Sequence, residues 1–119
     1  MPPPSTLAEY ELAWTTSVRI TTPEIQKSVT TYVDIPQSVY EHFDIANQPI
    51  MVDSYESGSG SVTAYAWCKP VFRIASTSTI HRLMCDTCNP NMYITQKDNE
   101  NDLAGETFSV KVSLFAKPL

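Results

Sequence analysis

Apolar and polar side chains alternate with a period of two near the amino terminus. The even positions from 8 to 20 are mostly apolar and the odd positions mostly polar; the even set is Ala8, Tyr10, Leu12, Trp14, Thr16, Val18 and Ile20. Successive side chains of a β-strand point to opposite faces, so this pattern predicts one long half-buried strand, or two with a bend. The carboxyl-terminal region repeats it with Phe108, Val110, Val112, Leu114 and Ala116, and Phe115 is the exception.

Turn residues divide the middle of the chain into short β-rich runs. We expect strands at residues 29–35, 50–55, 61–68, 71–75, 80–84 and 92–96. Residues 36–43 favour a short helix, because Pro36 suits a first turn and Val39 and Phe43 are four positions apart. The fold class predicted is all-β, an antiparallel β-sandwich or jelly-roll-like barrel with one short helical connector. Residues 1–7 form a Pro-rich arm and 8–119 a single β domain.

Composition excludes several classes of protein. The chain has 119 residues, 42% of them hydrophobic and 18% charged, which is typical of a globular domain. A net charge of −5 and eight scattered Lys and Arg residues argue against nucleic-acid binding. No apolar run reaches the roughly 18 residues of a membrane span, and no secretory signal is visible. Three cysteines cannot all pair within one chain, so a disulfide scaffold is not expected.

The stretch CDTCNPN, residues 85–91, is the strongest candidate for a chemical site. Cys68, His81, Cys85 and Cys88 form the pattern C-x12-H-x3-C-x2-C, a Cys3His set that would close a structural zinc site. A hairpin turning near residues 76–77 would place Cys68 opposite Cys85. The alternative is that Cys68 is a small buried apolar residue and that Cys85 and Cys88 are loop thiols. A redox pair would need a helix after the motif, which Asn-Pro-Asn forbids.

Tyr65 and Trp67 share one face of the expected strand 61–68, and Val62, Ala64, Ala66 and Cys68 share the other. A strand with two apolar faces is either buried on both sides or presents an aromatic surface, here the Tyr65/Trp67 pair, to a sugar or protein partner. Two other polar segments suggest no site. The acidic loop 98–102 lacks the glycine of a calcium loop, and residues 57–60 are expected to be a hairpin tip.

Two stretches resemble strands of picorna-like viral capsid jelly rolls. They are GSGSVTAYAWCKP at 58–70 and FSVKVSLFAKPL at 108–119, together about a fifth of the chain. The resemblance implies a jelly-roll fold and a place in a virion. It assigns no functional residue, because the matching stretches contain no motif specific to that family.

No nucleophile and base are recognisable around the two histidines, His42 and His81, so the chain is not expected to be an enzyme. The leading hypothesis is a non-catalytic structural or assembly protein, a small virion component that packs against neighbouring protein subunits in a homo- or hetero-oligomer. One alternative is a β-sandwich module that binds carbohydrate or protein through Tyr65 and Trp67. Another is a zinc-stabilised interaction domain. No other cofactor is expected.

Overall fold

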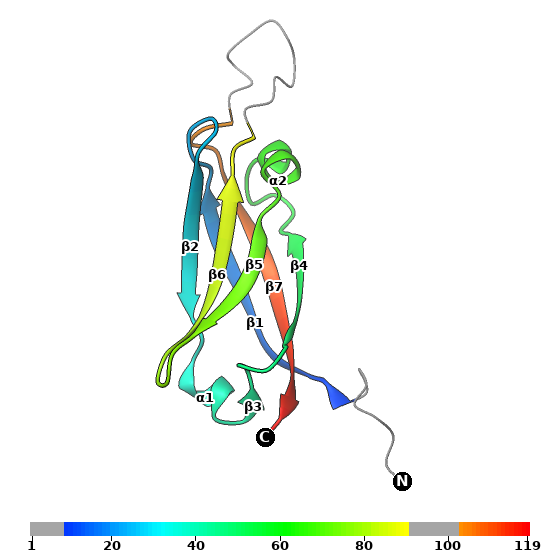
Figure 1. Cartoon of the computed structure of the whole chain (residues 1–119). Helices are drawn as coiled ribbons and strands as arrows, with labels where there is room; N and C mark the ends of the chain where they lie inside the picture. Colours follow the sequence, from blue (N-terminus) through cyan, green and yellow to red (C-terminus); the bar gives the residue numbers. More distant parts are fainter. Residues whose placement is uncertain (1–8, 91–102) are drawn as a thin grey trace, which may run out of the picture.

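The computed structural model describes residues 9–90 and 103–119, and this part of the chain forms two antiparallel β-sheets (Figure 1). We call them sheet A and sheet B. In sheet A the central strand β7 (Thr107–Pro118) pairs on one side with β1 (Glu11–Thr21) and on the other with β4 (Ile50–Tyr55) and the short β3 (Phe43–Asp44). In sheet B the central strand β6 (His81–Cys88) lies between β2 (Ser28–Asp34) and β5 (Val71–Ser76).

One buried cluster joins the two sheets, in the manner of a sandwich. The inward face of β7 consists of Phe108, Val110, Val112, Leu114 and Ala116, and all of them are buried. Leu83 and Cys85 of β6 and Val18 and Ile20 of β1 belong to the same cluster. The alternation at the two ends of the sequence therefore marks the faces that are withdrawn from water, which is the main source of stability in such a fold.

A short helix, α1 (Gln37–Tyr40), connects β2 to β3, as the sequence predicts. Pro36 is its N-cap, and Val39 is the residue that the helix buries. In Figure 1, α1 and β3 lie at the lower end of the molecule and the second helix, α2 (Val62–Cys68), lies at the opposite end.

The strand expected at 61–68 is wrong, because this segment is the helix α2. Ser61 Oγ caps its first turn by accepting a hydrogen bond from the Ala64 N–H at 3.1 Å. Ala64 and Cys68, four positions apart, face the core together. Lys69 ends the helix in the left-handed conformation and Pro70 prevents its continuation. Residues 57–60 consequently lead into a helix, and the expected hairpin tip there is also wrong.

A β-bulge interrupts β1 near its start. Leu12 pairs with Phe115, whereas Trp14 pairs with Leu114, so Ala13 is the extra residue. Directly paired residues point to the same face of a sheet. Trp14 therefore faces the core beside Leu114, and Leu12 faces outward beside Phe115. The expected single apolar face through both Leu12 and Trp14 is wrong at this point.

The remaining predicted strands at 29–35, 50–55, 71–75 and 80–84 correspond to β2, β4, β5 and β6. The strand expected at 92–96, the acidic loop 98–102 and the arm 1–7 lie outside the described residues. Within residues 9–90 and 103–119, no helix has the length and apolar character needed to cross a membrane.

Candidate functional site

The two cysteines of the CxxC motif lie in the carboxyl-terminal half of strand β6, not in a loop. Cys85 is 1% exposed and belongs to the core, whereas Cys88, three positions further, is exposed. An odd spacing along a strand places side chains on opposite faces. The two thiols therefore cannot chelate one ion as a loop CxxC would.

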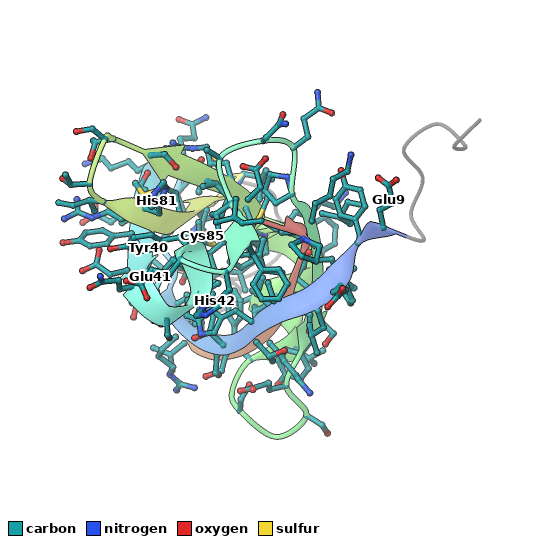
Figure 2. The ribbon with its side chains drawn as sticks, turned by 90° about the horizontal axis from the view of Figure 1, so that it is seen from below. Glu9, Tyr40, Glu41, His42, His81 and Cys85 are labelled. Atoms are coloured by element: carbon teal, nitrogen blue, oxygen red, sulfur yellow. The ribbon has the colours of Figure 1, made fainter. Side chains whose placement is uncertain are left out.

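His81 lies at the other end of β6. Seven positions of strand separate it from Cys88, about 23 Å, whereas zinc ligands all approach the metal within about 2.3 Å. His81 Nδ1 instead lies 2.7 Å from Ser76 Oγ. Its ring packs against Tyr40, tilted by 50°, with centroids 4.6 Å apart (Figure 2). The structure does not bring the Cys3His set together, and the described residues contain no other group of three metal-ligating side chains.

The expected pairing of Cys68 with Cys85 is also wrong. Phe72 occupies the position opposite Cys85, and the hairpin turns through residues 77–80, where the Thr77 N–H donates to the Ile80 carbonyl at 2.8 Å. The turn lies further along the chain than expected, so every partner shifts by four positions. Cys68 is the last residue of α2 and therefore lies outside the β5–β6 hairpin.

The buried thiols are poorly suited to chemistry. Burial raises the pKa of Cys85 to about 11. The hydrogen bond between Cys85 and Thr87 opposes this rise, and the nearby carboxylates of Asp86 and Asp53 add to it. Burial and the neighbouring Cys88 raise the pKa of Cys68 as well. The thiolate is the form that attacks electrophiles and binds metals. Cys68 and Cys85 are therefore protonated at neutral pH and serve as small core residues.

Tyr65 and Trp67 do not form a common surface, because residues two positions apart in a helix point to nearly opposite sides. The Tyr65 ring packs on Tyr55 and Phe108, at centroid distances of 5.4 and 5.8 Å. Trp67 is 37% exposed and lines an open hollow of about 530 Å³, whose described lining also contains Ala66, Lys69 and Pro90. Of the two aromatic residues, only Trp67 is placed to meet a ligand.

The outer face of sheet A carries an apolar surface that the sequence analysis missed. Leu12, Phe115 and Ile50 stand in one cross-strand row of β1, β7 and β4, and Val52 follows two positions after Ile50. Leu12 is 56% and Val52 55% exposed, while Phe115 and Ile50 are half-buried. We call these four residues the Leu12 patch. Among these four, Leu12 faces outward because of the bulge at Ala13.

Small hydroxyl side chains continue this face beyond the Leu12 patch. Thr15 Oγ1 lies 3.3 Å from Ser113 Oγ, and Ser17 donates to Glu56 Oε2 at 2.8 Å. Further along, Arg19 donates to Thr107 Oγ1 at 2.7 Å and to Ser109 Oγ at 3.1 Å. The hydroxyl groups named here are thus paired with neighbouring side chains, and the exposed Lys111, between Ser17 and Ser54, adds a positive charge to the same face.

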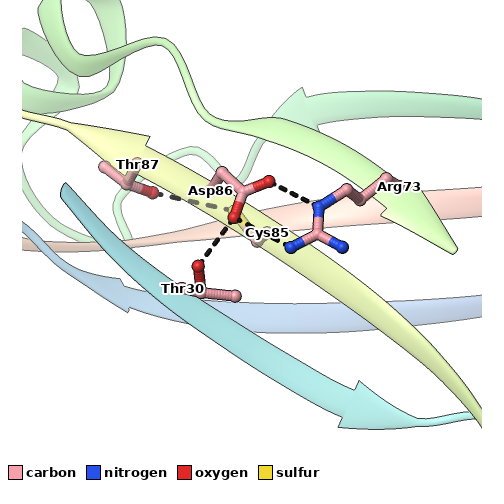
Figure 3. Close-up of polar contacts among 5 residues, drawn as sticks. All are labelled: Thr30, Arg73, Cys85, Asp86 and Thr87. Atoms are coloured by element: carbon pink, nitrogen blue, oxygen red, sulfur yellow. Dashed lines mark hydrogen bonds and ion pairs between the residues drawn. The ribbon is translucent and has the colours of Figure 1, made fainter. Parts of the chain in front are cut away.

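The outer face of sheet B is polar and cross-linked between its strands (Figure 3). Arg73 Nε on β5 donates to Asp86 Oδ2 on β6 at 2.7 Å, and the Thr30 hydroxyl on β2 donates to Asp86 Oδ1 at 2.7 Å. These two donors hold the pKa of Asp86 below its ordinary value. Two rows further along the same face, Arg82 pairs with Asp34 at 2.9 Å and covers the Tyr32 ring.

One sequence signal could have revealed the Leu12 patch. Phe115 breaks the alternation of the carboxyl-terminal strand, and a large apolar residue on an otherwise polar face indicates an outward-facing contact. The bulge that places Leu12 beside it has no recognisable signature among these residues.

The comparisons with known proteins add no relative: no family model, no curated protein and no solved structure matches the chain.

Proposed function

We propose that the chain is a non-catalytic structural protein that assembles with neighbouring protein subunits. The observation that carries the proposal is the Leu12 patch, a row of apolar side chains across three strands of sheet A. Apolar groups grouped on an outer sheet face gain free energy when a partner removes them from water, at roughly 25 cal/mol for each Å². The paired hydroxyls beside the patch can be covered at little desolvation cost.

Within this class we propose a small virion component. The support is the likeness of FSVKVSLFAKPL, residues 108–119, which contains all of β7 except Thr107, to strands of picorna-like capsid proteins. The other stretch of that likeness forms the helix α2 and no longer supports it. A jelly-roll arrangement of the two sheets belongs to the same proposal.

The test is the mass of the purified protein by light scattering across a range of concentrations, for the wild type and for Leu12→Asp. A matched control is Val62→Asp, because Val62 is 57% exposed on α2, outside the patch. We expect the wild type to associate above its 13.3 kDa monomer mass, Leu12→Asp to have a lower mass than the wild type at the same concentration, and Val62→Asp to behave as the wild type. A wild type that stays monomeric at every concentration, or equal effects of the two variants, would contradict the proposal.

A second candidate function is ligand binding at Trp67. The observation that favours it is the hollow that Trp67 lines with Lys69 and Pro90, since an exposed indole ring stacks on sugars and other flat groups. The test is a glycan array on the wild type and on Trp67→Ala. Binding that is lost in Trp67→Ala supports this function, and the absence of binding to the wild type removes it.

A further inference from the structure

Among residues 9–90 and 103–119, strand β2 is the end of sheet B and pairs with β6 on one side only. In Figure 1 it forms one margin of the molecule, and β1 runs behind it and diverges from it toward the lower end. An edge strand leaves about half of its backbone N–H and C=O groups pointing away from the sheet, where another strand can pair with them. β2 is seven residues long, which is enough for a stable ladder.

The other edge strands of the described chain carry features that discourage such pairing. Asp53 stands in the middle of β4 and Arg73 in the middle of β5. β1 contains the bulge at Ala13 and the charged Arg19. Charges and bulges are the usual means by which proteins protect sheet edges. β2 reads Ser-Val-Thr-Thr-Tyr-Val-Asp and has only one charged residue, at its last position.

The β2 sequence is complementary to itself when two copies run antiparallel. A two-fold axis through Thr31 pairs Val29 with Val33 of the second copy, and Thr30 with Tyr32. The same register pairs Ser28 with Asp34 of the second copy, so that no two like charges meet. The apolar pair falls on the inner face of sheet B and the Thr–Tyr pair on the outer face, because neighbours along a strand alternate.

We propose that two copies of this chain join through β2, antiparallel about Thr31, and extend sheet B into one six-stranded sheet. This inference rests on the proposed assembly function and names the partner, a second copy, for one of its contacts. Backbone hydrogen bonds supply the pairing, and the complementary side chains select the register. The Leu12 patch lies on sheet A and stays available for a different contact.

The first test introduces a negative or a positive charge at one neutral position, Ser28. Ser28 is exposed, so Ser28→Asp and Ser28→Lys should both preserve the monomer fold. Each substitution acts twice in a two-fold dimer, opposite Asp34 of the other copy. Sedimentation equilibrium should show a dimer Kd raised about three- to tenfold for Ser28→Asp and lowered for Ser28→Lys, with both shifts reduced in high salt. Ser54→Asp, on the β4 edge, is the control and should leave the Kd unchanged.

The second test measures the register by cross-linking. In a Cys85→Ala, Cys88→Ser background, which removes the thiol paired with position 31 across β2 and β6 as well as the exposed native thiol, Thr31→Cys should form an intermolecular disulfide under mild oxidation. Residues on the two-fold axis face each other at about 5 Å between Cα atoms. Val29→Cys should not form a disulfide with the same position of the second copy, because the two Cα atoms would lie about 13 Å apart along the strands.

The outcomes separate this inference from the proposed function. One outcome would overturn the β2 contact and leave the assembly function standing. In it the protein still associates, Ser28→Asp and Ser28→Lys have the same effect, and Thr31→Cys forms no cross-link. A chain that remains monomeric in every variant would overturn both. Opposite shifts for the two Ser28 variants, together with a cross-link at position 31 and none at 29, establish the β2 contact.

Discussion

Gly60 lies directly against the backbone of Thr107: a Cβ added at Gly60 would overlap the Thr107 carbonyl oxygen. This close approach lets the Ser61 N–H donate to the same carbonyl at 2.9 Å, so that α2 starts beside the first residue of β7.

We expect Gly60→Ala to lower the free energy of unfolding by about 3 kcal/mol, because the turn must move away from β7 to accept the methyl group. Gly58→Ala is the matched control. Gly58 also has a positive φ, 79°, but has no atom within 4 Å of an added Cβ, so only the backbone cost of about 1 kcal/mol should appear. Urea unfolding of both variants measures the difference, and equal losses would show that the Gly60–Thr107 contact does not constrain the turn.

Asp86 should contribute to stability in a pH-dependent way. Its folded pKa lies below the ordinary value of about 3.9, because Arg73 and Thr30 donate to the carboxylate. The stabilisation is therefore complete above pH 3.9 and is lost as the pH falls through the folded pKa. Asp86→Asn should be less stable than the wild type near pH 6, and the two stabilities should converge in acid.

Thermal unfolding from pH 2 to pH 7 measures this convergence. Arg73→Gln provides the control in a double-mutant cycle, since it should destabilise the wild type but have little further effect in Asp86→Asn. A gap between the wild type and Asp86→Asn that stays constant over the whole range would contradict the ion pair as the cause.

The three thiols should differ sharply in reactivity. Cys88 is exposed, whereas Cys68 and Cys85 are buried and their pKa values are raised. Brief treatment of the native protein with iodoacetamide at pH 8 should add one carbamidomethyl group, located at Cys88 by peptide mass mapping. Unfolding in urea should allow all three to react. Rapid native labelling of Cys85 would show that β6 opens at that point.

Alkaline pH should destabilise the fold through Cys85. The folded pKa is about 11 and the unfolded pKa is near 8.5, so the unfolded chain releases its proton first. The resulting stability is complete below pH 8.5 and is lost as the pH rises toward 11, by about 3 kcal/mol in total. Denaturant unfolding of the wild type and of Cys85→Ala at pH 7 and pH 10.5 separates this effect from those of other groups. An equal loss in both proteins would contradict the assignment.

The parts of the fold that follow from local alternation could be predicted from sequence. The carboxyl-terminal pattern of β7 and the positions after Trp14 in β1 identify the core face, because burial imposes a period of two on any strand with one dry side. The strand predicted at 61–68 was wrong. The apolar residues of this segment fall at both even and odd positions, so alternation could not identify its structure. The helix signals there, Ser61 before the run and Pro70 after it, were the better guide.

The candidate site could not be predicted from the sequence, because it depends on features that no single residue indicates. The Leu12 patch exists because one extra residue at Ala13 reverses the direction of Leu12, and its row is completed by β4 and β7, which are distant in sequence. The zinc hypothesis failed because the β5–β6 turn at 77–80 sets the register, and His81 and Cys88 then occupy opposite ends of one strand.

The central position of β7 in sheet A has a consequence for the order of folding. Every β1–β7 pair, from Glu11 with Ala116 to Thr21 with Thr107, joins residues more than 80 positions apart. Such non-local pairing raises contact order and slows folding toward the millisecond-to-second range of β proteins. On the ribosome, β1 and β4 must both wait for their shared partner, so sheet B, whose β5–β6 hairpin is local, is the part that can form first.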